Sequence, residues 1–185
     1  MDYYDLGSYG RPVTTSSEKA QLWFDRGLVW TYGYNHEEAV VCLQRAVKLD
    51  PDCAMAHWGI AYAIGPNYNK QWGDFEDDEK PEALTLARDA IEQAVRLTDR
   101  VTAPEKAMIE AITHRYPADA SVEDFGPWND AYADAMRGVH KSHPDDLDIC
   151  CLFAEAIMNR TPWQLWDLPS GRGLGTAPVN PRVRV

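Results

Sequence analysis

Two histidines and two cysteines between residues 35 and 69 are the side chains best suited to chemistry in this sequence. Cys53 and His57 are four residues apart, so on a helix they share one face and could supply two zinc ligands. His36 begins the preceding helix, whereas Cys53 follows that helix's far end, on the order of 20 Å away. Cys42 is also too far from Cys53 for a disulfide, which needs Cα atoms within roughly 7 Å. We therefore predict no metal site, and expect all the cysteines to be reduced and to fill the core or a groove.

The segment GPNYN, at residues 65–69, is the second candidate for a site. Pairing of two antiparallel helices brings His36, at the start of one, close to Asn67 and Asn69, at the end of the next. Trp72 is near in sequence, so these side chains could form a polar rim that holds a ligand or an ion. The alternative is a capping cluster, in which the amides bind helix-end carbonyl groups. The residues alone leave both interpretations open.

Motifs that would indicate catalysis are incomplete. GPNYNK lacks the second glycine and the Ser or Thr of a phosphate-binding loop. GRGLG, at residues 171–175, does not follow a predicted strand, as a dinucleotide-binding fingerprint would. No nucleophile motif of the G-x-S-x-G kind is present. We therefore predict no catalytic residue and no cofactor, and expect a protein that is not an enzyme.

The elements that must position these side chains are helices, because apolar residues recur with a helical period almost everywhere. Three capping boxes predict helix starts, at Thr15-x-x-Glu18, Asn35-x-x-Glu38 and Thr102-x-x-Glu105. Further helices are expected near 53–64, around 83–94, from about 127, and over 147–158. No useful stretch alternates between apolar and polar residues, so no strand is expected. The prediction is an all-α fold of antiparallel helix pairs.

Charge and composition limit the partners. The chain has 185 residues, a net charge of −11 and a pI near 4.8. Nucleic acids and anionic membranes attract basic surfaces, so we expect neither as a partner. The N-terminus has no signal-peptide pattern, and no apolar run approaches the roughly 20 residues that span a bilayer. We expect a cytoplasmic protein.

One stretch of the chain has the positions of a repeat of about 34 residues. Counted back from Pro51, a unit beginning at Ala20 has aromatic, small and apolar residues at regular places. These are Trp23, Gly27, Trp30, Ala39, Leu43 and Ala46. The unit resembles a tetratricopeptide repeat, in which small residues let two helices approach closely and a proline ends the second. The later units match less well.

The resemblance extends to longer segments. FDRGL, YNHEEA, LDPDCAMAHWGIAYAIGPNYN and TPWQLWDL are similar to parts of long, poorly characterised microbial tetratricopeptide-repeat proteins. It implies helix-turn-helix repeats stacked into a right-handed α-solenoid. We expect an N-terminal extension over 1–16, a repeat domain over 17–160 with about three helix pairs and one extra helix, and a C-terminal segment over 161–185 that is disordered after residue 170.

The resemblance also implies a concave groove, lined by the first helix of each unit. The inward positions include Gln21 and Gly65, with Phe24, Leu28, Thr31, Met55, Trp58, Tyr62, Met108 and Ile112, and Cys151 and Glu155 in the last unit. Their largely apolar and aromatic character is typical of binding surfaces. The alternative is that the superhelix itself, or further repeats, cover these residues. The leading hypothesis is a scaffold that binds a peptide or helix of another protein in this groove.

Two other hypotheses stay open. The chain could be the N-terminal part of a larger enzyme or metal-binding repeat protein, with a rim site at His36, Asn67, Asn69 and Trp72. It could also be a truncated product with little activity of its own. An apolar end of the repeat stack after Met158 would then favour self-association.

Overall fold

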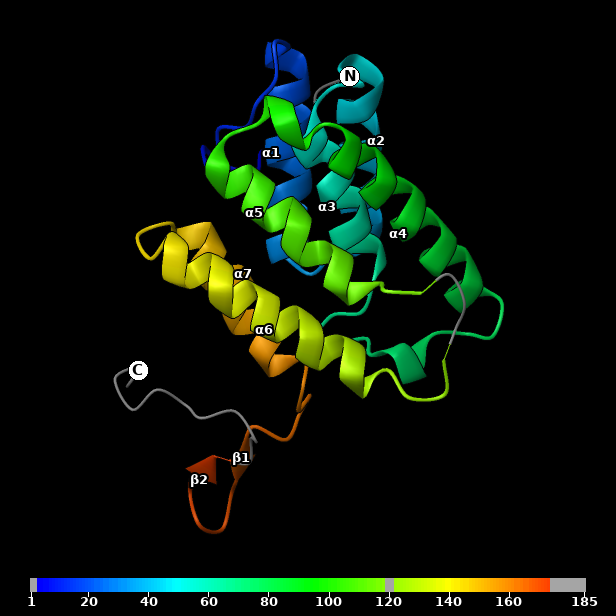
Figure 1. The fold of residues 1–185 in the computed structure, drawn as a ribbon, viewed down its shortest axis with the longest axis vertical. Helices are drawn as coiled ribbons and strands as arrows, with labels where there is room; N and C mark the ends of the chain where they lie inside the picture. The colour runs from blue at the N-terminus through cyan, green and yellow to red at the C-terminus, as the bar shows by residue number, and fades with distance from the viewer. Residues whose placement is uncertain (1–2, 119–121, 174–185) are drawn as a thin grey trace.

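The chain forms an all-α structure with one small hairpin near its C-terminus (Figure 1). The computed structural model describes residues 3–118 and 122–173. The helices within these ranges are α1 (Glu18–Tyr32), α2 (His36–Leu49), α3 (Ala54–Ile64), α4 (Glu79–Arg96), α5 (Ala103–Ile112), α6 (Gly126–Ser142) and α7 (Leu147–Met158). Short 3-10 turns lie at η1 (Trp72–Asp74), η2 (Thr98–Arg100) and η3 (Thr113–Arg115). The predicted all-α class is confirmed.

Side-chain caps begin several of these helices. Asn35 caps α2, because its side-chain oxygen accepts a hydrogen bond from the backbone N–H three residues later, at 3.3 Å. Thr102 and Glu105 form the predicted reciprocal capping box at α5. The first predicted box is wrong: Ser17 caps α1, while the Thr15 hydroxyl donates to the Asp50 carboxylate instead.

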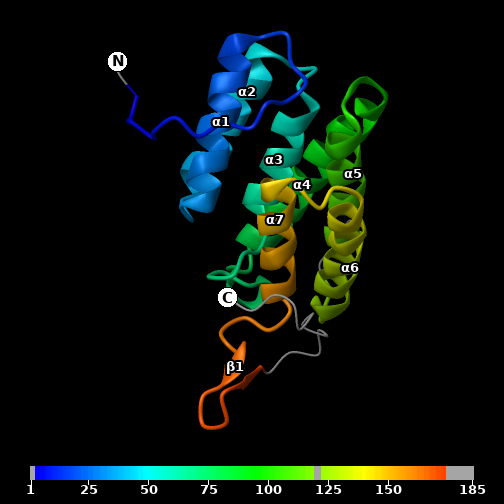
Figure 2. The same cartoon turned by 90° about the vertical axis from the view of Figure 1, so that its left-hand side faces the viewer.

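Helix α3 lies at the centre of the fold. It packs against α2 and α4, and it also contacts α1 and α5 (Figures 1 and 2). Ten of its eleven residues are buried, as expected for a helix that is apolar on nearly every side. Burial of each large apolar side chain stabilises the fold by about 1.5–3 kcal/mol.

The close approach of α1, α2 and α3 depends on two glycines. A Cβ atom on Gly27 of α1 would lie 2.5 Å from Cγ of Leu43, and one on Gly59 of α3 would lie 2.7 Å from its Cδ2. Real Cβ atoms do not approach so closely, so Leu43 of α2 fits between two helices only because both positions lack a side chain.

An aromatic cluster joins the connection between α3 and α4 to the start of α6. The Trp72 ring stacks on Phe125 with centroids 4.6 Å apart, and it meets Phe75, Tyr116 and Trp128 within 6.3 Å. Such ring pairs contribute about 0.5–1.5 kcal/mol beyond their buried area. The cluster therefore holds the loop between α3 and α4 against the start of α6.

The first residues form an arm along α1 that also reaches two later helices. Both the backbone N–H and the hydroxyl of Thr14 donate to Glu105 of α5, each at 2.7 Å. The Arg11 guanidinium binds both oxygens of Asp146, the N-cap of α7, at 2.7 and 2.8 Å. It also binds Asp148 at 2.9 Å. The arm therefore ties the first helix pair to the last helix.

A short hairpin follows α7. Strand β1 (Trp166–Asp167) pairs antiparallel with β2 (Arg172–Gly173). The expectation of no strand is wrong here, because a tight turn closes the pair: Gly171 has a φ of 65° and its N–H donates to the Asp167 carbonyl at 2.8 Å. The disorder expected after residue 170 concerns mainly residues 174–185, which lie outside the described residues.

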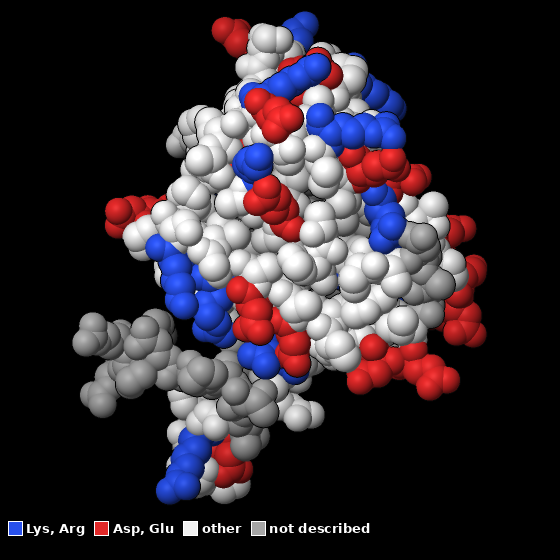
Figure 3. Space-filling model, in the orientation of Figure 1, with Lys and Arg blue, Asp and Glu red and all other residues white. Residues whose placement is uncertain are grey.

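Acidic and basic side chains are interspersed over the face drawn in Figure 3. This face therefore carries charges of both signs and has no large basic patch. Within residues 3–118 and 122–173, none of the helices combines the length and apolar character needed to cross a membrane.

Candidate functional site

Eight of the side chains expected on the concave face are buried. Each of the eight is at most 6% exposed: Phe24, Leu28, Thr31, Met55, Trp58, Tyr62, Met108 and Ile112. The Trp58 ring stacks on Tyr62 with centroids 5.2 Å apart. This differs from the expectation of an accessible face, because neighbouring helices cover α3 on nearly every side. Of the eight, Thr31 and Tyr62 still reach a surface pocket, at its floor.

A groove made of three adjoining pockets runs from the start of α2 and the end of α3 to the space between the end of α1 and the exposed side of α7. We name them the rim pocket, the central pocket and the arm pocket, with volumes of about 670, 260 and 370 Å³. The rim and central pockets share Tyr34 and His36. The central and arm pockets share Tyr32 and Cys151. The three pockets thus adjoin one another in a row.

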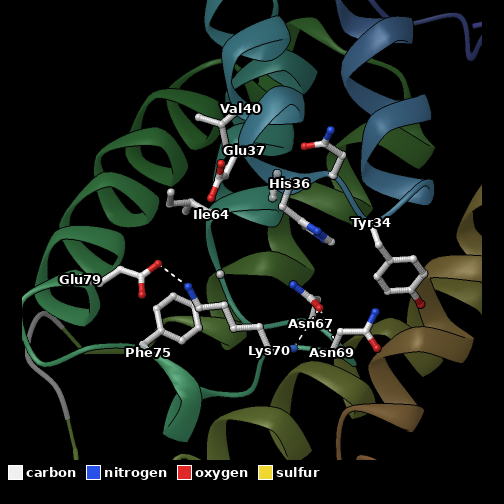
Figure 4. Close-up of a pocket in the computed structure, with 13 residues that line it drawn as sticks. Tyr34, His36, Glu37, Val40, Ile64, Asn67, Asn69, Lys70, Phe75 and Glu79 are labelled. Atoms are coloured by element: carbon white, nitrogen blue, oxygen red, sulfur yellow. Dashed lines mark hydrogen bonds and ion pairs between the residues drawn. The ribbon is translucent and has the colours of Figure 1, made fainter.

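The rim pocket brings together three of the four residues predicted for a rim site. His36, Asn67 and Asn69 line it together with residues of α2, α3 and the start of α4. Figure 4 shows the His36 ring pointing toward the two asparagines, with Tyr34 at one side of the pocket. Trp72 does not join them, because it is 3% exposed and belongs to the aromatic cluster below.

Hydrogen bonds show what the rim asparagines do. The Asn67 side-chain oxygen accepts backbone N–H bonds from Asn69 and Lys70, at 2.9 and 3.1 Å (Figure 4). Asn67 is 7% exposed and closes a tight turn. Its side-chain oxygen thus accepts from N–H groups of the loop, whereas the capping interpretation expected the amides to bind helix-end carbonyl groups. The Lys70 ammonium pairs with Glu79 across the pocket wall. Asn69, in contrast, is exposed at the pocket edge.

The surroundings of His36 favour its neutral form. Burial lowers its pKa below the ordinary histidine value, and this outweighs the attraction of the Glu155 carboxylate. A neutral imidazole can donate and accept hydrogen bonds at the junction of the rim and central pockets. It therefore suits recognition of a polar group better than attraction of an anion.

The α7 side of the groove is apolar and accessible. Cys151 and Glu155, the positions expected to point inward in the last unit, line the central pocket together with Ala154. Cys151 and Ala154 are exposed. Leu147, at the start of the helix, is 80% exposed and lines the arm pocket. Helix α7 thus has apolar side chains on both its buried and its exposed face, whereas a surface helix usually has polar residues on its exposed face.

Cys42, Cys53 and His57 have structural roles rather than forming a site. Cys42 and Cys53 are buried and unbridged, and a ring nitrogen of His57 lies 2.9 Å from the Pro51 carbonyl oxygen. Cys150 is exposed and lines none of the three pockets, so it is not a core or groove filler as predicted. Within the described ranges, no three His, Cys, Asp or Glu side chains are grouped to hold a metal ion.

The arm is the part of the site that sequence reasoning missed. Leu6 and Tyr9 line the arm pocket, and the hydroxyls of Tyr9 and Tyr32 both donate to Asp148 of α7. Arg11 binds the same carboxylate, so the arm forms part of the wall at one end of the groove. The signal in the sequence was a single arginine among tyrosines and glycines, which does not reveal its distant partners.

Comparisons with models of known protein families, with curated proteins and with solved structures gave no match.

Proposed function

We propose that this chain is a non-enzymatic, cytoplasmic scaffold that binds a peptide segment or helix of another protein in the groove between α1 and α7. The observation that carries the proposal is the row of three adjoining pockets, each lined by an exposed tyrosine. The outer face of α7 lines the central and arm pockets. Aromatic side chains are favoured at binding surfaces, because they supply large contact areas at little entropic cost.

The packing of the helices supports a repeat architecture of the tetratricopeptide kind. Neighbouring helices pair along the chain, and α1 contacts α3 as α3 contacts α5. In stacked repeats the first helices of successive units meet in this way and line a concave surface. We infer a short right-handed solenoid, in which the groove is the concave surface near its mouth rather than the deeper face that the repeat positions suggested.

Selection from a library of displayed 12-residue peptides tests the proposal. Ala154→Arg places a long charged side chain in the groove from an exposed helical position, so selected peptides should bind this variant at least tenfold more weakly. Val95→Arg is the matched control, because Val95 is 42% exposed on α4 and lines none of the three pockets. Peptides that bind Ala154→Arg as tightly as the unmodified protein would refute the groove.

A second copy of the chain is another occupant that the α7 face would accept. Sedimentation measured from 5 to 200 μM distinguishes the two, because self-association through α7 should be lost in Ala154→Arg. A dimer at all these concentrations, together with failure to select any peptide, would replace the peptide proposal with self-association.

The rim pocket favours a second function, recognition of a polar small molecule. Its volume of about 670 Å³ lies within the range of about 300–1,000 Å³ typical of ligand sites. His36 and Asn69 supply polar groups, and Phe75 and Val40 supply apolar walls. A thermal-shift screen of polar metabolites and divalent ions, run beside elemental analysis of the purified protein, tests it. A ligand that stabilises the protein but not the His36→Phe variant supports this function.

A further inference from the structure

The central pocket contains a carboxylate whose hydrogen-bond partners are all neutral. One oxygen of Glu155 accepts a hydrogen bond from the Tyr62 hydroxyl, and the other accepts from the Asn159 amide at 3.1 Å. In the described part of the chain, no lysine or arginine forms an ion pair with Glu155, whereas Asp148 in the arm pocket is already paired with Arg11. The negative charge of Glu155 is therefore not neutralised by a direct contact.

The nearest buried cation lies behind the pocket wall. Arg115 is 2% exposed, and its guanidinium carbon is 4.7 Å from the centroid of the Tyr62 ring. It donates to the Pro66 carbonyl oxygen and is absent from the pocket lining. Arg115 attracts Glu155 at a distance, but of the two only Glu155 lines the central pocket. His36 also lines the pocket, and burial lowers its pKa, which favours the uncharged form.

The negative charge of Glu155 affects the pKa values of two tyrosines that line the pocket. The pKa of the Tyr34 hydroxyl is raised, first by burial and then by the negative charge of Glu155. Burial is also the main reason that the pKa of Tyr62 is raised, with Glu155 as the next cause. The contribution of Glu155 at both tyrosines is that of a nearby negative charge, which favours a positively charged ligand, while Arg115 acts in the opposite direction at Tyr62.

The pocket walls have the shape and chemistry for an aliphatic stem with a cationic end. Tyr34 has a φ of 58°, uncommon for a residue other than glycine, and this backbone conformation holds its ring over the pocket beside His36, with ring centroids 5.9 Å apart. Ala154 and Met158 form an apolar side. Aromatic faces attract ammonium and guanidinium groups. At about 260 Å³ the pocket is smaller than typical small-molecule sites, as expected if it receives one side chain.

We propose that the central pocket binds a lysine or arginine side chain of the peptide held in the groove, with the cationic end beside Glu155 and the stem between Tyr34 and Met158. The proposal rests on the proposed peptide-binding function and adds the chemical identity of the partner's anchoring residue.

The first test uses n-butylammonium, which mimics the end of lysine, and n-butanol as its neutral counterpart. Methyl NMR signals of Ala154 and Met158 should shift and saturate with n-butylammonium at millimolar concentration, and n-butanol should shift them at least fivefold less at equal concentration. Glu155→Gln should weaken n-butylammonium binding at least fivefold. Glu110→Gln makes the same charge change at an exposed position on α5 outside the three pockets, and should leave binding unchanged.

A second variant keeps the test decisive if Glu155→Gln disturbs the fold. Tyr34→Asn removes the aromatic wall but keeps a residue that tolerates positive φ, so it should fold and bind n-butylammonium at least threefold more weakly. Equal shifts with n-butanol and n-butylammonium, or unchanged affinity in both variants, would overturn the proposal.

Peptides from the library selection separate this inference from the proposed function. Each lysine or arginine of a selected peptide is replaced in turn by norleucine. At one position, this replacement should weaken binding to the unmodified protein at least fivefold, and binding to Glu155→Gln much less. If the peptides bind in the groove but no such replacement matters, the inference fails while the scaffold function stands. If n-butylammonium binds but no peptide does, the scaffold function fails and the pocket belongs to a free amine.

Discussion

The arginine of the N-terminal arm should contribute strongly to stability, and Arg11→Met tests this. The guanidinium is 11% exposed and makes three charged hydrogen bonds of 2.7 to 2.9 Å, to Asp146 and Asp148, which are 21% and 14% exposed. Methionine keeps much of the apolar stem but leaves two carboxylates without their cation. Arg11 and Asp146 are 135 positions apart in the sequence, so the interaction links the two ends of the helix stack.

The expected cost follows from this geometry. A hydrogen bond to a charged group contributes about 1.5–3 kcal/mol, but three bonds to one guanidinium are not additive. Breaking a fully buried ion pair costs about 3–5 kcal/mol, and partial exposure reduces this figure. We expect a loss of about 2–3 kcal/mol in the free energy of unfolding, which corresponds to a fall of about 5–10 °C in Tm for a chain of this size.

Urea denaturation followed by far-UV circular dichroism measures the loss. Arg100→Met is the matched control, because the Arg100–Asp52 pair is 68% and 71% exposed and should contribute less than about 1 kcal/mol. Asp146→Asn still caps α7, so its combination with Arg11→Met should be less destabilising than the sum of the single changes. If Arg11→Met costs no more than Arg100→Met, the arm does not fasten α7 and our reasoning is wrong.

Two further predictions concern the core and the arm's other anchor. Gly27→Ala should cost about 1–3 kcal/mol in urea denaturation, because the new Cβ would overlap Leu43, whereas Gly138→Ala in α6 meets nothing within 4 Å and should stabilise by up to about 1 kcal/mol. Burial raises the pKa of Glu105, but hydrogen bonds from Thr102 and from the arm outweigh it, so the folded pKa is lowered. The stabilisation from Glu105 should therefore be complete above the ordinary glutamate pKa of about 4.3 and be lost as pH falls through the lower folded value. Denaturation between pH 2 and pH 7 should show a weaker pH dependence in Glu105→Gln, and an unchanged slope would contradict the assignment.

The helices could be predicted from the sequence because their signals are local. The cap at Asn35 and the capping box of Thr102 and Glu105 depend on residues within three positions of each other, and both were located correctly. At α1 both Thr15 and Ser17 are residue types that cap helices, and local sequence does not decide which of them is the cap. Thr15 donates to Asp50, which only the fold brings near.

The rim could be anticipated for a related reason. Once two consecutive helices pair antiparallel, the start of the first must lie near the end of the second, and this places His36 beside Asn67 and Asn69. Trp72 lay only a few residues farther on, but its partners Phe125 and Trp128 come from α6. Chain distance could not show that it turns away from the rim.

The sequence by itself determined the helical class, most helix boundaries and the juxtaposition at the rim, because these depend on neighbouring residues and on one short turn. Only the tertiary structure decided which apolar faces reach solvent. Trp58 is buried and Ala154 is exposed, although both lie on apolar helices, because burial depends on which elements cover a face. The same reason applies to Glu155: its charge is plain in the sequence, but the absence of an ion pair, among the residues that the structure describes, is a property of the assembled groove.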